Sequence, residues 1–172
     1  MKKTLSLLAI LASLVTASAQ GTFQFVAALN GSNEVPPNGS PGIGTGQFTL
    51  TGSSLDVFVD ISLAFEPTGA FLQGPAAAGS TGPRIFDLGT PILRPPIFPI
   101  DPGGREYVFN GATLSSSQIS DLMAGLWYVN VTSAAFPDGE IRGQILAVPE
   151  PSTLALLALA TGAGWLRLRR KA

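Results

Sequence analysis

Polar and apolar residues alternate with a period of two along much of the chain, most regularly over residues 22–30 and 55–63. Such alternation is typical of a β-strand that packs one face against a core and exposes the other to water. Shorter stretches of similar character predict strands over residues 46–50, 84–88 and 106–109. In the two regular strands, the apolar face consists of Phe23, Phe25, Ala27, Leu29, Leu55, Val57, Val59, Ile61 and Leu63.

Residues 126–145 hold the densest pattern and predict a β-hairpin around which the domain is organised. The reversal falls at Phe-Pro-Asp-Gly, residues 136–139, because proline presets φ near −65° and glycine tolerates a positive φ. The returning strand covers residues 140–147. In the first strand Trp127, Val129 and Val131 face away from Leu126, Tyr128 and Asn130; in the second, Ile141 and Ile145 face away from Arg142, Gln144 and Leu146.

Residues 115–124 predict a helix that leads directly into this hairpin. Ser115 can cap its N-terminus, Gln118 can complete a capping box, and Gly125 ends it. Glycine, proline and alanine dominate residues 66–83, whose pattern predicts no defined element. Residues 90–104 carry five prolines and indicate a loop or an edge segment, since proline cannot donate to a central ladder.

The two ends of the chain have a different character from the middle. Residues 1–19 combine a basic start, an apolar run and an Ala-Ser-Ala site, which predicts a secretory signal peptide cleaved before Gln20. Residues 148–172 form a tail in which an apolar span, residues 153–166, precedes a basic end. A helix of this span would cover about 21 Å, less than the ~30 Å hydrocarbon core. Its terminal position and its arginines, which can snorkel, nevertheless favour insertion into a membrane.

These patterns together predict three segments and a mainly β fold. Residues 1–19 are the signal peptide, residues 20–147 the β domain and residues 148–172 the tail. We expect an antiparallel β-sandwich or barrel-like domain with one short helix, plus an N-terminal signal helix and a C-terminal hydrophobic helix.

The composition narrows the chemistry that the domain can perform. The chain has no cysteine and no histidine, which removes thiolate sites, the commonest metal ligand and the usual general base near neutral pH. Residues 20–148 contain four arginines, no lysine and ten acidic residues, a formal charge of −6. We therefore expect no nucleic-acid partner, since nucleic acid is bound through clustered lysine and arginine. We also expect no cofactor, no metal and no catalytic residue.

The tail resembles the PEP-CTERM sorting signals of Gram-negative bacteria. The motif Val148-Pro149-Glu150-Pro151-Ser152 is followed by the short apolar span and by a basic cluster. The resemblance implies export through the Sec pathway, transient anchoring in the inner membrane, cleavage near Pro-Glu-Pro by an exosortase, and delivery to the cell surface or extracellular matrix. The basic cluster that would retain the tail in the membrane is Arg167, Arg169, Arg170 and Lys171.

The middle of the chain resembles the CHRD domain, over most of residues 23–146. The resemblance rests on residues 25–31 with 33–37, residues 44–46, residues 74–88, and residues 125–131 with 139–144. It carries over no defined biochemical activity. The family often has histidines where this chain has Phe71, Gln73 and Thr132. If those histidines bind a metal, this chain has lost the ligands; if they form a hydrogen-bonded cluster, Gln73 and Thr132 can partly replace them.

Several of these motifs have both a structural and a functional interpretation. The loop Asn33-Glu34-Val35-Pro36-Pro37 is either a turn that Glu34 holds in place or a binding loop. Arg142 either pairs structurally with Glu34 or forms a recognition pair with Glu140. We expect Glu34 and Arg142 to lie within ion-pair distance. The family motif residues with a structural role are then Asn33, Glu34, Pro36, Pro37, Glu140 and Arg142.

Three functions remain open from the sequence. The first is a non-enzymatic protein of the cell surface or biofilm matrix, with an exosortase as processing partner and exopolysaccharide as a candidate partner. The second is an extracellular binding module for a polysaccharide, a protein ligand or calcium. The third is a hydrolase with an unrecognised carboxylate pair. Calcium would need several oxygen donors together, and the candidates are Asp87, Asp101, Asp138 and Glu140.

Overall fold

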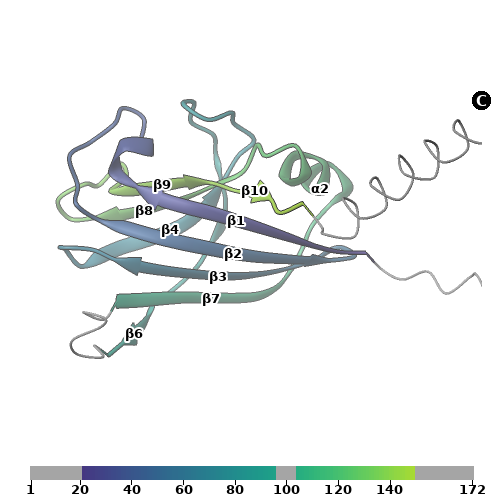
Figure 1. Cartoon of the computed structure of the whole chain (residues 1–172), viewed down its shortest axis with the longest axis horizontal. Coiled ribbons are helices and arrows are strands. Elements are labelled where there is room, and N and C mark those ends of the chain that lie inside the picture. Colours follow the sequence, from purple (N-terminus) through teal and green to yellow (C-terminus); the bar gives the residue numbers. More distant parts are fainter. Residues whose placement is uncertain (1–20, 96–103, 150–172) are drawn as a thin grey trace, which may run out of the picture.

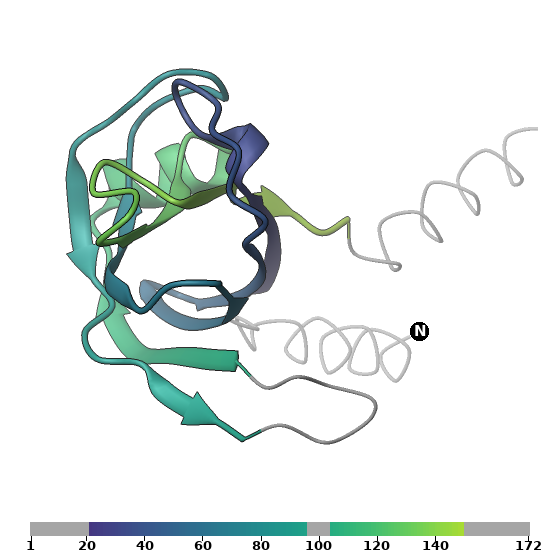
Figure 2. The same cartoon turned by 90° about the vertical axis from the view of Figure 1, so that its left-hand side faces the viewer.

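A computed structural model describes residues 21–95 and 104–149 and shows one strongly curved antiparallel sheet (Figures 1 and 2). The strands follow the order β5-β4-β8-β9-β1-β2-β3-β7-β6 across the sheet, and β10 also pairs with β1. Their bounds are β1 Thr22–Asn30, β2 Ile43–Thr51, β3 Ser54–Ser62, β4 Pro67–Gln73, β5 Arg84–Asp87, β6 Ile92–Arg94, β7 Gly104–Thr113, β8 Tyr128–Ser133, β9 Ile141–Gln144 and β10 Leu146–Ala147. A short 3-10 helix, η1 (Gly31–Asn33), follows β1, and the α-helix α2 (Ser116–Met123) precedes β8.

The sheet curls into a half-barrel whose concave face encloses the hydrophobic core. The mainly β fold is confirmed, and its architecture matches the barrel-like prediction rather than the sandwich, because the described strands form one sheet. Phe86 of β5 lies 6.0 Å from Phe109 of β7, ring centre to ring centre, so the sheet curls far enough for distant strands to meet. The fully buried large side chains of the core include Phe25, Leu29, Phe48, Leu50, Leu55, Ile61, Leu72, Tyr107, Leu122, Trp127 and Ile141.

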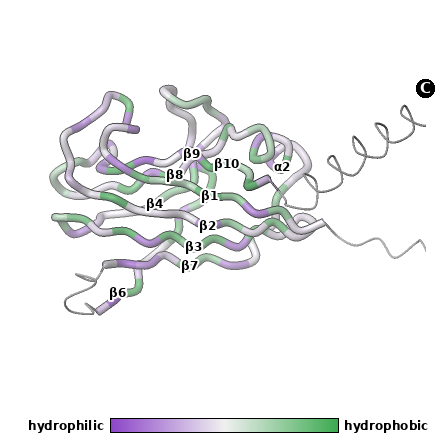
Figure 3. Tube along the Cα trace, in the orientation of Figure 1, coloured by the Kyte–Doolittle hydropathy of each residue, from purple (hydrophilic) through white to green (hydrophobic). Residues whose placement is uncertain are grey.

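The regular alternation of the sequence is reproduced in β1 and β3. Phe25, Ala27 and Leu29 are buried in β1 while their neighbours are exposed, and β3 buries Leu55, Val57, Val59 and Ile61. Figure 3 shows the resulting succession of hydrophobic and hydrophilic positions along these strands. Burying one face of each strand removes apolar area from water, which stabilises the fold by about 25 cal/mol for each Å² buried. The buried face also fixes the register of β1 against β2 and of β2 against β3.

The predicted helix and hairpin are both present. Ser115 caps α2 and forms the capping box with Gln118, while Gly125 follows the helix at φ +69°. Strands β8 and β9 pair with Val131 opposite Ile141, and Gly139 in the connecting turn has φ +155°. The helix has three apolar residues, Ile119, Leu122 and Met123. It buries Leu122 completely but leaves Met123 42% exposed, so its buried apolar face is narrower than the sequence suggests.

Two regions differ from the sequence-based prediction. β4 lies inside the sheet, between β5 and β8, although its residues predicted no element, and β7 extends over ten residues where a short strand was expected. The last four residues of β4 are all buried, because both faces of the sheet are covered there. A strand that is covered on both faces loses the alternating signal. β6 is the edge strand that the proline-rich stretch indicated.

The end of the domain is paired with its beginning. Leu146 lies opposite Val26 and Ala147 opposite Phe25, and the amide of Val148 donates to the carbonyl of Gln24 at 2.8 Å. Within residues 21–95 and 104–149 no helix is long and apolar enough to cross a membrane. The predicted signal helix and the hydrophobic span of the tail lie outside the described residues.

Candidate functional site

The convex face of β4, β8 and β9 is covered by two loops, residues 31–42 and 74–83, and is polar where the concave face is apolar. Six side chains there form what we call the polar layer: Gln73, Tyr128, Asn130, Thr132, Arg142 and Gln144. The alternation of Tyr128, Asn130, Arg142 and Gln144 with core residues was predicted, whereas the position of Gln73 in a strand and the burial of the layer were not. Five of the six are under 10% exposed, and Gln144 is half-buried.

Hydrogen bonds attach both loops to the polar layer. The Tyr128 hydroxyl donates to Oε1 of Gln73 at 2.6 Å and accepts from the amide of Gly82 at 2.9 Å. The amide group of Gln144 donates to the carbonyls of Ala76 and Gly125 at 3.0 and 2.7 Å. Loop 74–83 is therefore fixed over the sheet by side chains that point outward from β8 and β9.

Arg142 lies at the centre of this arrangement and is only 2% exposed. Its guanidinium stacks on the Tyr128 ring at 3.5 Å from the ring centre, and Nη2 donates to the carbonyl of Ser80 at 2.7 Å. Within the described part of the chain its side chain has no carboxylate oxygen within 4.0 Å. The predicted ion pair between Glu34 and Arg142 is therefore wrong, because Tyr128 and Ser80 direct the guanidinium toward loop 74–83.

Glu34 is buried beside Arg142 but is held by a different neighbour. Its carboxylate lies against Gly139, where an added Cβ would come within 2.6 Å of both carboxylate oxygens, so glycine is required for this contact. Burial raises the pKa of Glu34 to about 7, although the charge of Arg142 and the Val35 backbone amide lower it in part. Its Oε1 is buried and receives no hydrogen bond. The loss of hydration on burial outweighs the two favourable contacts and therefore favours the protonated form.

Loop 31–42 is held in place by the side chains of Asn33, Asn38 and Ser40, the last of which bonds to Glu140. Asn33 donates to the carbonyls of Ala28 and Arg142 at 3.2 and 3.1 Å, and Asn38 donates to those of Gly139 and Glu140 at 2.9 and 3.2 Å. Glu140 is fully buried; its Oε1 accepts from the Ser40 hydroxyl at 2.9 Å, and its Oε2 has no partner. Loop 31–42 is thus attached to β1 and β9 through Asn33, and to the β8–β9 turn through Asn38 and Ser40.

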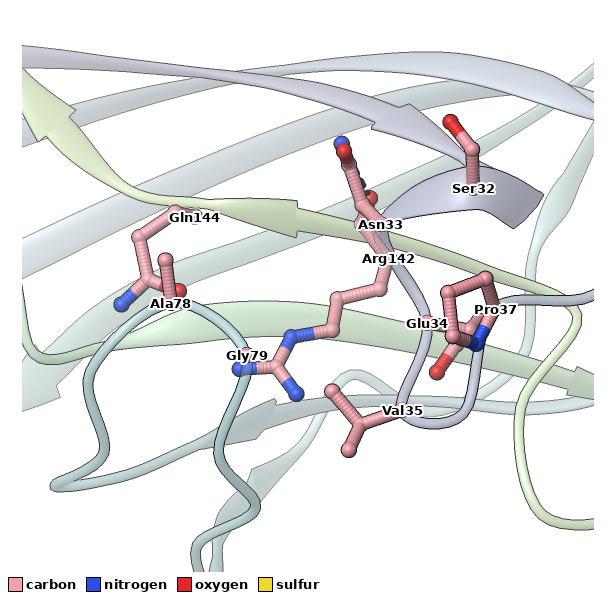
Figure 4. A pocket seen from close by; sticks show the side chains of 9 residues that line it. All are labelled: Ser32, Asn33, Glu34, Val35, Pro37, Ala78, Gly79, Arg142 and Gln144. Carbon is pink, nitrogen blue, oxygen red and sulfur yellow. Dashed lines mark hydrogen bonds between the residues drawn. The ribbon is translucent and has the colours of Figure 1, made fainter.

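A cavity of about 350 Å³ opens between the two loops (Figure 4). The guanidinium of Arg142 points into the space beside Gly79 and Val35, and the Glu34 carboxylate lies on the far side of Val35. A second cavity of about 210 Å³ shares Glu34 and Val35 with the first and is bordered by Pro36 and Asp138. The first cavity is lined by Ser32, Asn33, Glu34, Val35, Pro37, Ala78, Gly79, Arg142 and Gln144.

Phe71, Gln73 and Thr132, the three positions where the family resemblance led us to expect histidine, lie on the same convex face but make separate contacts. Gln73 bonds to Tyr128, Thr132 bonds to the Thr68 hydroxyl at 2.9 Å, and the Phe71 ring lies under the Arg84 guanidinium at 3.7 Å. Gln73 and Thr132 therefore each form a hydrogen bond, but not with one another.

The remaining candidate ligands are dispersed. No group of three or more acidic, histidine or cysteine side chains that could hold a metal ion occurs within residues 21–95 and 104–149. Asp87 accepts from the Gly89 amide at 2.8 Å, Asp138 is exposed, and Asp101 lies outside the described residues. Trp127 and Tyr128 are both fully buried, so neither ring is free to stack on a ligand.

The sorting motif lies largely outside the described residues. Val148 and Pro149 are described and exposed, directly after β10. Glu150, Pro151, Ser152 and the basic residues Arg167, Arg169, Arg170 and Lys171 are not described.

Sequence analysis did not identify the cavity. Ser80, Ala78 and Gly79 had no recognised role, and Gln144 was assigned only to a strand face. The available signal was the glycine-rich and proline-rich loop 74–83, which together with outward-facing polar residues of the hairpin indicates a covered polar surface.

Comparison with protein-family models gives two matches. The model of the CHRD domain matches residues 25–145, and the model of the PEP-CTERM protein-sorting motif matches residues 147–171. No curated protein and no solved structure matches the chain.

Proposed function

This chain belongs to the CHRD-domain family and carries a PEP-CTERM sorting motif, and from this premise we propose that it is a non-enzymatic protein of the cell surface or the extracellular matrix. The sorting motif marks the chain as an exported protein that an exosortase sorts, with transient anchoring in the membrane before release at the surface. A Gram-negative host, a biofilm matrix and an exopolysaccharide partner are part of the proposal.

The observation that carries the proposal is the place of the sorting motif relative to the folded domain. The match begins at residue 147, where β10 ends, so the motif starts as soon as the domain is complete. The pairing of β10 with β1 closes the fold before the motif and leaves Val148 and Pro149 exposed. An enzyme that cuts beyond this point releases an intact acidic domain.

A non-enzymatic role is supported by the way in which the polar layer is used. Tyr128, Gln144 and Asn33 donate or accept hydrogen bonds that hold loops in place. The chain also offers no histidine or cysteine for acid–base or nucleophilic chemistry.

Deletion of residues 148–172 in the native host tests the proposal. We expect the full chain to be processed and recovered from the cell surface or matrix, and the shortened chain to lose this location while retaining its fold. A matched variant that replaces Arg167, Arg169, Arg170 and Lys171 by serine should be exported but released without processing. Unchanged processing and location of the shortened chain would contradict the proposal.

A second candidate function, an extracellular binding module, is favoured by the cavity between the two loops. The cavity has a buried guanidinium on one wall and a buried carboxyl on another. Such a combination of shape and polar groups is common in small-molecule sites.

A further inference from the structure

We propose that the cavity between loops 31–42 and 74–83 binds one neutral sugar residue of a polysaccharide, with Arg142 donating hydrogen bonds to its hydroxyl groups and Gln144 and Glu34 accepting from them. This inference rests on the proposed surface or matrix function, and it adds the ligand class and the residues that recognise it. The site is shown in Figure 4.

Arg142 provides donors that the protein does not use. A guanidinium has five N–H groups, and within the described residues this one makes a single hydrogen bond, to the carbonyl of Ser80. The stack on Tyr128 fixes the plane of the guanidinium, so the remaining donors keep their direction. A charge that is 2% exposed and lacks an ion-pair partner among the described residues calls for acceptors from outside the chain.

Two acceptors among the lining residues of the cavity lack donors. Oε1 of Gln144 and Oε1 of Glu34 are buried and receive no hydrogen bond. An ionised carboxylate or phosphate ligand can satisfy Arg142 but has no proton to give to Oε1 of Gln144. A hydroxyl group both donates and accepts, so adjacent sugar hydroxyls can satisfy the guanidinium and the two oxygens together.

The size and the apolar part of the cavity agree with one sugar residue. Its volume of about 350 Å³ is near the lower end of the range for small-molecule sites. Val35, Pro37 and Ala78 supply apolar wall that can contact the C–H groups of a sugar ring. The opening between the loops lets a polymer enter with the rest of its chain outside.

The charge of the domain distinguishes a neutral polymer from an acidic one. Residues 20–148 carry a formal charge of −6, which repels a polyanion at low and moderate ionic strength. A neutral polysaccharide is not repelled by this charge, and the buried guanidinium of Arg142 then binds its hydroxyl groups.

The test uses the full chain, purified in a detergent without a sugar headgroup, and saturation-transfer NMR with glucose, galactose, mannose, glucuronate and acetate. We expect at least one of the three neutral hexoses to give a saturable signal and neither anion to displace it. Absence of binding by all three hexoses, or displacement by acetate, would overturn the inference. Loss of sorting in the tail-deletion experiment is a separate result, so failure of the site and failure of the proposed function are distinguishable.

Two neighbouring alanines provide a matched pair of variants. Ala78 lines the cavity, whereas Ala77 is exposed and does not, so Ala78→Tyr should reduce binding at least tenfold and Ala77→Tyr should leave it unchanged. Arg142→Lys keeps the positive charge but loses the planar guanidinium, whose N–H donors have fixed directions. It should also weaken binding at least tenfold. Near-UV circular dichroism checks the fold of each variant, and equal effects of the two tyrosines would contradict the site.

Discussion

The two faces of β8 and β9 are both buried, yet they are stabilised in opposite ways. On the concave face Trp127, Val129 and Val131 are completely inaccessible and contact other apolar side chains. On the convex face Tyr128, Asn130 and Arg142 are nearly as inaccessible, but they contact loops through hydrogen bonds and one stacked guanidinium.

The difference shows which face is fixed by packing alone and which retains unused polar groups. Packing is non-directional and needs only shape, whereas each buried polar atom needs a specific partner. The convex face leaves Oδ1 of Asn130, Oε1 of Gln144 and Oε1 of Glu34 without donors. The concave face also has exceptions, since Nε1 of Trp127 and the Tyr107 hydroxyl are buried without partners. Of the three convex-face residues, Gln144 and Glu34 line the cavity between the two loops, whereas Asn130 does not.

The largest effect is expected from the concave face. Trp127→Ala removes a fully buried ring that packs 6.2 Å from Phe86, and it should lower the free energy of unfolding by about 3–5 kcal/mol. Urea unfolding followed by circular dichroism measures this loss. Val108→Ala, at a side chain that is 43% exposed, should change stability by less than about 0.5 kcal/mol. A similar cost for both variants would mean that the concave face is not the main source of stability.

The next effect belongs to Glu34 and depends on pH. Because its pKa is raised from 4.5 to about 7, the folded protein keeps a proton that the unfolded chain has lost, and stability falls as pH rises through this interval. At about 1.4 kcal/mol per pH unit the contribution is on the order of 3 kcal/mol, present at low pH and lost by about pH 7. Glu34→Gln resembles the protonated form and should therefore be more stable than the wild type at pH 8 but not at pH 4.

Unfolding by urea at a series of pH values measures this difference. Asp121→Asn, which removes a carboxyl from α2 away from the polar layer, is the matched control for the loss of one negative charge. If wild type and Glu34→Gln keep a constant difference from pH 4 to pH 8, the buried carboxyl does not titrate as described.

The smallest effect is expected at Thr132, one of the positions where the family resemblance led us to expect histidine. Thr132→Val removes the hydrogen bond to the Thr68 hydroxyl at little change of volume, and it should cost about 1 kcal/mol of unfolding free energy. The double variant Thr68→Val with Thr132→Val should cost less than the sum of the single changes, because neither hydroxyl is then left without its partner. Strict additivity in urea unfolding would show that the two hydroxyls do not interact.

The sequence predicted those parts of the fold in which one face is wet. β1 and β3 alternate clearly because their outward residues meet water, and the capping box of α2 is a local signal. β4 was missed because loops cover its outer face, which removes the polar half of the pattern. The same cause concealed the polar layer, since outward polar residues in a strand look alike whether water or a loop covers them.

The sequence predicted that Glu34 and Arg142 lie near one another, but neither their contacts nor the cavity that both line. Which partner each side chain takes depends on the Tyr128 ring and on the absence of a Cβ at Gly139, and neither is evident before the strands are in register.

The pairing of β10 with β1 gives the domain two distinct poles. The Val148 amide bonds to Gln24 near the start of β1, and η1, which borders the cavity, begins where β1 ends (Figure 1). Six steps along the strand lead from Gln24 to Asn30, roughly 20 Å at about 3.4 Å per residue, and η1 begins at the next residue. A domain held through its tail would therefore keep its open pole well clear of the attachment point, so that its orientation, and not only its affinity, would favour capture of polymers that lie outside the cell.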